Sequence, residues 1–170
     1  MEQTYFKLTT ETKVNIFGIT LFRLELTIDC KHGKSGDKGG WIDTLLTPSG
    51  NARVSGDAWV SGDACVSGNA WVSGDAWVYG NACVSGNAQV YGDAQVYGNA
   101  WDESPLQIQG ARHFFNICAK GKIKIGCMEY TFSEWELNFE KIGKSQNYTE
   151  RQIKEYHFYI KLAIELSNLK

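Results

Sequence analysis

The sequence is poor in the residues that most often carry catalysis or bind metals. It contains only three histidines, and its five cysteines form no CxxC pair. His32, His113 and His157 share no motif, so neither a structural zinc site nor a three-histidine catalytic metal site is expected. We therefore expect a protein without a metal or another cofactor.

Strong net charge and long hydrophobic runs are also absent. The net charge is −2, which gives no basic stripe for nucleic acid. No run of about eighteen apolar residues is present, so no membrane span is expected. Residues 1–13 are polar and lack the apolar core of a signal peptide. An odd number of cysteines without a secretion signal then favours reduced thiols and a cytoplasmic location.

What the sequence does contain is a short repeat between residues 50 and 102. Each unit has six residues, and the first three units are GNARVS, GDAWVS and GDACVS. Gly, Ala and Val each recur every six residues. A fixed short period of this kind is typical of a solenoid, in which each unit covers the next and none folds alone.

The position of each residue in the repeat predicts its direction. Side chains alternate along a strand, so Ala and Val should point into a narrow tube while their neighbours point outward. Gly followed by Asn or Asp is turn chemistry, which predicts one corner per unit. Asn51, Asn69 and Asn87 are spaced by eighteen residues, so three units per coil would stack them in a column. The nine units then make about three coils.

The outward residues fall on three sides of this tube. The first side carries Arg53, Ser55, Trp71, Ser73, Gln89 and Tyr91. The second side carries Trp59, Ser61, Trp77, Tyr79, Gln95 and Tyr97. The third side carries Cys65, Ser67, Cys83, Ser85, Trp101 and Glu103.

Aromatic residues make the second side the strongest candidate for a binding surface. Neighbouring coils lie roughly 4.8 Å apart, so Trp59 should stack beside Trp77, and Tyr79 beside Tyr97. Such a side is too apolar to be left bare, and its cover could be the C-terminal helix, a symmetry mate or a partner. The candidate interface comprises six aromatic residues: Trp59, Trp77, Tyr79, Tyr97, Trp71 and Tyr91.

The remaining features of the coils are interpreted as structural. Cys65 and Cys83 should lie in adjacent coils, and we interpret them as small surface or interface residues rather than a redox pair. Asp57, Asp75 and Asp93 form a column that could attract calcium. Two such charges repel by only about 1 kcal/mol in water, however, so no ion is needed and a corner role is favoured.

Residues 1–49 should cap the open end of the tube, because an uncapped edge exposes backbone donors and acceptors. Extended stretches are predicted near Lys13–Ile16 and Thr20–Ile28, on either side of Gly18. Gly39-Gly40 resembles a degenerate corner before a strand at Trp41-Ile42. The glycine-rich residues 33–40 could cradle a phosphate, but they lack the P-loop arrangement and a flexible cap loop is favoured.

Residues 104–170 should form the other cap or a small α+β subdomain. Arg112–Ala119 and Lys122–Cys127 flank Lys120-Gly121, a predicted hairpin turn. Residues 133–136 and 149–152 have the form of capping boxes, which predicts a short helix ending near Gly143 and a longer one to about Asn168. The buried stripe of the longer helix is predicted at Ile153, Tyr156, His157, Ile160, Ala163, Ile164 and Ser167.

The whole chain resembles a group of small hexapeptide-repeat proteins encoded by bacteriophages and prophages. The resemblance rests on YFKLTTETK, GKSGDKGGWI, GDAWVSGDA, GNAQVYGDA, IKIGCMEYTFSEWE and KEYHFYIKLAIEL. It implies a mainly β fold, a left-handed parallel β-helix with triangular coils. The expected domains are an N-terminal β cap (1–49), the hexapeptide β-helix (50–103) and a C-terminal hairpin with two helices (104–170).

Many hexapeptide β-helix proteins are acyltransferases, which need a general base, usually histidine, in a cleft between subunits. Here no histidine lies in the repeats and no loop interrupts the coils. His157 is interpreted as a packed or rim residue, His113 as part of a strand and His32 as solvated. We therefore expect no enzymatic activity.

The expected function is non-catalytic binding by a phage-derived protein in a bacterial host cell. An anti-defence role is the hypothesis: the protein would block a host immune complex or sequester a nucleotide signal. Two alternatives stay open, an acyl- or acetyltransferase with its site between subunits and a structural phage protein that works by self-assembly. The expected partners are further copies of the chain, in a dimer or trimer, with a host protein or small nucleotide as ligand.

Overall fold

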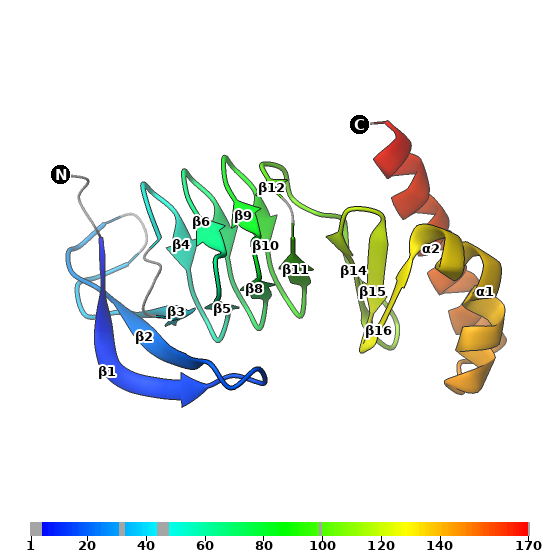
Figure 1. The fold of residues 1–170 in the computed structure, drawn as a ribbon, viewed down its shortest axis with the longest axis horizontal. Helices are drawn as coiled ribbons and strands as arrows, with labels where there is room; N and C mark the ends of the chain where they lie inside the picture. Colours follow the sequence, from blue (N-terminus) through cyan, green and yellow to red (C-terminus); the bar gives the residue numbers. More distant parts are fainter. Residues whose placement is uncertain (1–4, 31–32, 44–47, 99, 170) are drawn as a thin grey trace. The chain divides into compact units, whose positions relative to one another are not determined.

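The computed structural model describes residues 5–30, 33–43, 48–98 and 100–169. The chain divides into two compact units, with the boundary between Pro105 and Leu106. The first unit is a β-solenoid with an N-terminal hairpin, and the second is a small α+β unit (Figure 1). Neither of the two described helices combines the length and apolarity that crossing a membrane requires.

Short parallel strands build the coils. They are β4 (Arg53–Val54), β5 (Trp59–Val60), β6 (Cys65–Val66), β7 (Trp71–Val72), β8 (Trp77–Tyr79), β9 (Cys83–Val84), β10 (Gln89–Val90), β11 (Gln95–Tyr97) and β12 (Ala100–Trp101). Strands one coil apart pair in parallel, which gives sheets ordered β10-β7-β4 and β12-β9-β6 and places β5, β8 and β11 side by side in a third. Arg53 pairs with Trp71 and Trp71 with Gln89, an eighteen-residue register. The predicted three-sided tube of about three coils is confirmed.

The interior of the tube holds the alanines and valines of the repeat, as their alternation predicted. Every repeat Ala from Ala52 to Ala94 and every repeat Val from Val54 to Val96 is buried. Backbone hydrogen bonds join successive coils; for example, the Arg53 amide donates to the Ala70 carbonyl at 2.9 Å. Outside, the Asn51 amide donates to Asn69 at 3.1 Å and Asn69 donates to Asn87 at 3.2 Å, which confirms the predicted column.

Each corner depends on a glycine. The repeat glycines from Gly50 to Gly98 all have φ between +61° and +75°, the left-handed region that side chains disfavour. Most of them also lie against the backbone of the next coil. A Cβ built on Gly74 would lie 3.0 Å from the Gly92 nitrogen, whereas one on Gly98 would meet nothing within 4 Å. The corner glycines therefore serve coil stacking as well as turning.

The last coil departs from the predicted register. Ala100 pairs with Cys83 and Trp101 with Val84, a shift of one residue from the eighteen-residue spacing. Because a one-residue slip exchanges the two faces of a strand, Ala100 is exposed and Trp101 takes the face of the buried Val84. Trp101 is half-buried with its Nε1 atom enclosed. The prediction that Trp101 belongs to the outward column is wrong.

The N-terminal residues extend one sheet of the solenoid and cover its first coil. β1 (Phe6–Val14) and β2 (Thr20–Leu26) form an antiparallel hairpin, and β3 (Lys38–Ile42) pairs antiparallel with β2 and parallel with β5. The sheet order is β1-β2-β3-β5-β8-β11. The predicted strand at Lys13–Ile16 is wrong in its bounds, because Asn15 and Ile16 belong to the hairpin turn.

Gly39 and Gly40 lie inside β3 and form no corner, which corrects the prediction from their sequence. Their lack of a side chain allows β3 to approach the first coil. A Cβ on Gly40 would lie 2.7 Å from the Ala58 carbonyl oxygen, and one on Gly39 would lie 3.0 Å from the Val54 carbonyl oxygen. The chain therefore caps this end of the tube by close backbone contact.

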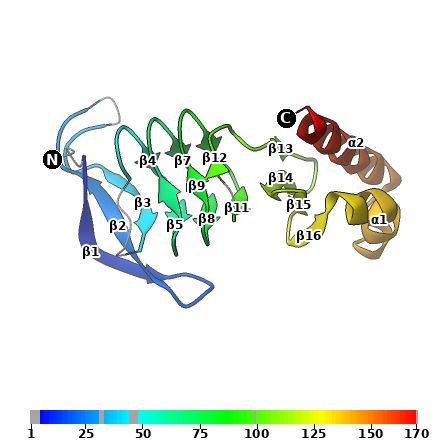
Figure 2. The same ribbon diagram turned by 45° about the horizontal axis from the view of Figure 1, so that its top comes forward.

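The second unit is a four-stranded antiparallel sheet with two helices on one face (Figure 2). Its elements are β13 (Gln107–Gln109), β14 (Phe114–Ala119), β15 (Lys122–Ile125), β16 (Met128–Thr131), α1 (Phe132–Ser145) and α2 (Glu150–Asn168). The hairpin at Lys120-Gly121 and the end of α2 agree with the prediction. The second capping box is confirmed at Thr149 and Gln152, but the first is formed by Thr131 and Glu134, two residues before the predicted position.

The core of the second unit uses large side chains. Phe115 and Ile123 of the sheet pack with Trp135 of α1 and with Tyr156 and Ile160 of α2. The Trp135 indole donates to the Ile123 carbonyl at 3.0 Å, so its polar atom is satisfied inside the core. The predicted buried stripe of α2 is confirmed for Ile153, Tyr156, Ile160 and Ala163, while His157, Ile164 and Ser167 lie half-buried at its margins.

The corner glycines generate a matched test of coil stacking. Gly98→Ala should cost about 1–2 kcal/mol of unfolding free energy, because alanine must adopt a left-handed φ. Gly74→Ala should cost about 1–3 kcal/mol more, because its Cβ also meets the next coil. Urea denaturation measures both values. Equal losses in the two variants would contradict the stacking role of the corner.

Candidate binding surface

The aromatic side of the solenoid is covered in part by the chain's own N-terminal hairpin. Trp59 and Trp77 stack as predicted, with ring centroids 4.5 Å apart. However, Trp59 packs with Leu21 of β2 and Trp41 of β3 and is only 4% exposed. Trp59 therefore points out of the tube as predicted, but the hairpin covers it, so the prediction that it lies on an open binding surface is wrong. The residues that cover Trp59 come from before the repeat, a source that was not among the predicted ones.

Trp41 fastens the hairpin to the solenoid. The Lys13 ammonium and the Arg23 guanidinium lie 4.5 Å and 4.8 Å from the centre of the Trp41 ring. The Trp41 indole N–H and Arg23 Nη1 both donate to Oδ1 of Asp57 at 3.2 Å. These contacts join β1, β2 and β3 to the first corner of the aspartate column.

The surroundings of Trp41 lower the pKa of two groups, Asp57 and Lys13. The hydrogen bond from Trp41 is the largest cause that lowers the pKa of Asp57 below 3.8, and the bond from Arg23 adds to it. Burial lowers the pKa of Lys13, with Asp57 opposing that shift. The Arg23 guanidinium therefore lies beside Asp57, in keeping with a structural role for this residue.

The turn of the hairpin, residues 15–19, is held by its own hydrogen bonds. Oδ1 of Asn15 accepts from the backbone amides of Phe17 and Ile19, both at 2.9 Å. The Gly18 amide donates to the Asn15 carbonyl at 3.0 Å, with Gly18 at φ +77°. This is an Asx-type turn, which restricts the local backbone. The apolar side chains at the turn are thus presented by a defined conformation.

Two of these side chains project into solvent. Ile16 is 69% exposed and Phe17 is 53% exposed. The Phe17 ring also lies 5.4 Å from the Tyr79 ring, and Tyr79 stacks on Tyr97 at 5.2 Å, as the coil spacing predicted. The turn reaches along β5 and β8 (Figure 1). We call Val14, Ile16, Phe17, Tyr79 and Tyr97 the tip surface.

Sequence reasoning found Tyr79 and Tyr97 but missed Val14, Ile16 and Phe17. The segment VNIFGI carried a signal, because three apolar residues beside a glycine turn would be exposed at a hairpin end. The turn itself was placed at Gly18. What the sequence did not show is that this turn lies against the second side of the solenoid.

Trp71 and Tyr91 lie on the first side and are exposed, as predicted. Trp71 contacts two residues of the preceding coil. Its indole N–H donates to the Ser55 hydroxyl at 3.0 Å, and the Arg53 guanidinium lies 5.5 Å from its ring centre. The polar atom and the ring of Trp71 therefore both have partners on the first side of the tube. Trp71 belongs to a different sheet from Tyr79 and Tyr97 of the tip surface.

The third side carries a disulfide bond between Cys65 and Cys83. Their Cα atoms are 4.6 Å apart, because the two residues are directly paired in adjacent coils. The interpretation of these cysteines as separate reduced surface residues is therefore wrong: the register that stacked them also brought their sulfur atoms within bonding reach. The remaining cysteines, Cys30, Cys118 and Cys127, are not disulfide-bonded.

In the glycine-rich loop, several backbone N–H groups already donate hydrogen bonds to other residues of the protein. The amides of Lys34 and Ser35 donate to the carboxylates of Asp37 and Asp29 at 2.7 Å and 2.8 Å. The Gly36 amide donates to the Leu26 carbonyl at 2.9 Å. A phosphate at this loop would have to displace two carboxylates, so the loop serves as a turn between β2 and β3.

The histidines occupy unrelated environments. His113 is exposed, and its backbone amide donates to the Tyr156 hydroxyl at 2.6 Å. His157 stacks on Phe139 at 3.7 Å, and burial lowers its pKa. His32 lies outside the described residues. In the part of the chain that the structure describes, no three His, Cys, Asp or Glu side chains are grouped as a metal site would require.

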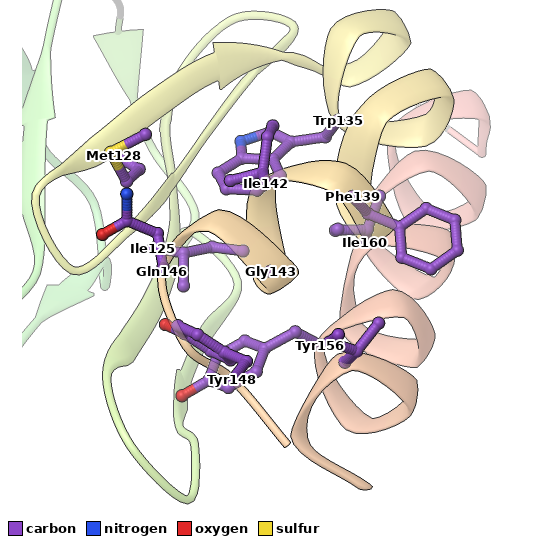
Figure 3. A pocket seen from close by; sticks show the side chains of 11 residues that line it. Ile125, Met128, Trp135, Phe139, Ile142, Gly143, Gln146, Tyr148, Tyr156 and Ile160 are labelled. Atoms are coloured by element: carbon purple, nitrogen blue, oxygen red, sulfur yellow. The ribbon is translucent and has the colours of Figure 1, made fainter. Parts of the chain in front are cut away.

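A small apolar hollow lies in the second unit, between the end of α1, the start of α2 and the turn before β16 (Figure 3). Its volume is about 30 Å³, room for about two water molecules. Four of its lining residues carry polar side-chain atoms: Trp135, Gln146, Tyr148 and Tyr156. Burial raises the pKa of Tyr148 to about 12, so the hydroxyl is neutral at physiological pH. The hollow is too small for an organic ligand of ordinary size.

Comparison with known proteins agrees with the fold. The sequence model of the YdcK β-solenoid repeat matches residues 49–62 and 76–92, both within the paired coils. Together with the parallel ladders, this match defines a β-solenoid repeat protein. No curated protein matches the chain.

The Asp57 contacts generate a pH-dependent prediction. Because the folded-state pKa of Asp57 is lowered, the stabilisation from its ionised form is complete above about pH 4–5 and is lost as the pH falls through that lowered pKa. The side chain is 69% exposed, so the contribution should be at most about 1 kcal/mol. Asp57→Asn should therefore lower the thermal midpoint slightly near neutral pH and flatten its decline in acid.

The control is Asp93→Asn, at the same corner two coils away, where neither Trp41 nor Arg23 is bonded. Thermal unfolding followed by tryptophan fluorescence from about pH 7 to about pH 3 measures both variants. Indistinguishable acid profiles for Asp57→Asn and the parent protein would show that this carboxylate does not fasten the hairpin.

Proposed function

We propose that this chain is a non-catalytic binding protein that recognises a partner protein through the tip surface. The observation that carries the proposal is the exposure of Ile16 and Phe17 on a turn fixed by Asn15. Exposed apolar groups on a rigid scaffold are typical of protein-interaction sites. Their fixed conformation lowers the entropy lost on binding.

The chemistry of the tip surface favours a protein as its partner. Its side chains are aliphatic and aromatic, and anchors of this kind carry most of the binding energy when they enter a partner's pocket. Residues 50–102 carry one Arg and five Asp, a balance of −4, which disfavours an anionic nucleotide on the coils. Binding of a host protein is thus favoured over sequestration of a nucleotide signal.

The proposed setting is a bacterial host cell, where a phage-derived protein would act against a defence complex. The Cys65–Cys83 disulfide removes the argument from reduced thiols, so the cytoplasmic location in this proposal rests on the resemblance alone. Support comes from the resemblance of both flanks to the phage-encoded hexapeptide-repeat group. The same resemblance supports left-handed coils. In this proposal the solenoid is a rigid mount that holds the hairpin and its apolar turn at a fixed place.

Single substitutions at the turn test the proposal. Ile16→Glu and Phe17→Glu should each weaken capture of the partner by at least about tenfold, because a charge would replace an apolar anchor. Bait protein with and without each substitution is used on bacterial lysate, and the captured protein is then purified and titrated by calorimetry.

The matched control is Leu137→Glu, which introduces the same charge at an exposed residue, 82%, of the second unit. It should leave partner binding unchanged. Equal affinity of the Ile16→Glu and Phe17→Glu proteins for the captured partner would refute recognition through the tip surface.

A further inference from the structure

Helix α2 carries two apolar faces, and only one of them packs against the described residues of the second unit. The inner face, with Ile153, Tyr156 and Ile160, is buried against the sheet and α1. A helix that packs on one side of a domain ordinarily presents charged and polar residues on its other side. The outer face of α2 departs from this rule.

The outer face presents a line of large apolar side chains. Phe158, Leu162, Leu166 and Leu169 are separated by four, four and three residues, so they follow one line along the helix. Phe158 is 65% exposed and Leu169 is 81% exposed, with Leu166 also exposed and Leu162 half-buried. We call these four residues the outer stripe.

Charges of opposite sign lie on one flank of the outer stripe. Lys161 and Glu165 are one helical turn apart, on the same side of Leu162. Within the described part of the chain, neither takes part in an ion pair, although Lys144 and Glu140 of α1, at the same spacing, do so. The flank therefore offers a positive and a negative charge in a fixed order.

We propose that the outer stripe pairs with the same stripe of a second copy, with the two α2 helices antiparallel. A two-fold axis at the level of Ala163, between Leu162 and Leu166, makes the interface isologous, so residue i meets j and j meets i. Phe158 then lies level with the second copy's Leu169, and Leu162 with the second copy's Leu162 and Leu166. The stripe is covered along its whole length.

The charges select the antiparallel arrangement. Around a two-fold axis, the same flanks of the two helices face each other, and Lys161 lies level with the second copy's Glu165. By symmetry, Glu165 lies level with the second copy's Lys161. A parallel arrangement would instead bring each residue level with its own copy, so the order of the charges would give no complementarity.

A second copy fits the stripe better than a lipid surface does. Membrane-surface helices carry a polar face rich in Lys and Arg. The charged residues of α2 are instead evenly divided between basic and acidic: Arg151, Lys154 and Lys161 against Glu150, Glu155 and Glu165. Four side chains per copy bury less than a standard interface of about 1,600 Å². We therefore expect a weak dimer, with Kd of roughly 1–100 µM.

This inference is independent of the proposed function, because it concerns another unit and another surface. It also assigns self-association to α2 and not to the aromatic side of the tube, which the hairpin partly covers. Sedimentation velocity of the full chain at roughly 1–500 µM, a range that spans the expected Kd, should show a monomer–dimer equilibrium. A chain that stays monomeric over this range overturns the proposal.

Substitutions locate the interface. Phe158→Glu and Leu166→Glu should each raise the dimer Kd at least about tenfold. The matched control is Leu137→Glu on α1, which is 82% exposed and lies off the stripe, and Ile16→Glu tests the tip surface. Both should leave the Kd unchanged, and circular dichroism melting checks that every variant is folded. Dimerisation that survives Phe158→Glu and Leu166→Glu, or is abolished by Ile16→Glu, overturns the proposal.

Exchange of the flank charges tests the direction of pairing. Lys161→Glu should weaken the dimer severalfold, because the introduced carboxylate would face the second copy's Glu165. The double variant Lys161→Glu/Glu165→Lys should restore the parental Kd, since the reciprocal pairs re-form with reversed sign. A double variant no tighter than Lys161→Glu alone would exclude the antiparallel register.

Discussion

The narrow interior of the solenoid is the constraint on which the rest of the structure depends. Short strands between tight corners make the tube narrow, and from Ala52 to Val96 the inward positions of the repeat are all Ala or Val. Corners must close tightly and still stack at van der Waals distance, which requires glycine with a positive φ. Both requirements recur at every corner, three times in each coil, which matches the six-residue spacing of Gly, Ala and Val in the sequence.

Because Ala and Val fill this interior, the residues that differ from one unit to the next lie on the outer sides of the tube. The outer sides carry the variable residues of each unit: the Asn51–Asn69–Asn87 column, the Cys65–Cys83 disulfide and the aromatic rows. The N-terminal hairpin then covers part of one aromatic row. Its fastening through Trp41 fixes where the apolar turn is presented.

The two units follow different packing rules. The solenoid stacks identical small residues in register, whereas the second unit packs a few large side chains such as Phe115, Trp135 and Tyr156 around one core. Both nevertheless leave apolar residues exposed at defined places, the turn at Ile16 and Phe17 and the outer line of α2. Because each is held by ordered backbone, each is a surface with a definite shape.

Local periodicity alone determined the solenoid, the direction of its Ala and Val residues, the coil register that stacks Tyr79 on Tyr97, and the Thr149 capping box. These follow from short-range rules repeated along the chain. The tertiary structure decided that the hairpin buries Trp59, that Cys65 and Cys83 are bonded, that a one-residue slip turns Trp101 toward the interior, and that Ile16 and Phe17 join Tyr79 and Tyr97 in one surface. Each of these depends on contacts between distant segments or on a break in the period, neither of which a repeat pattern contains.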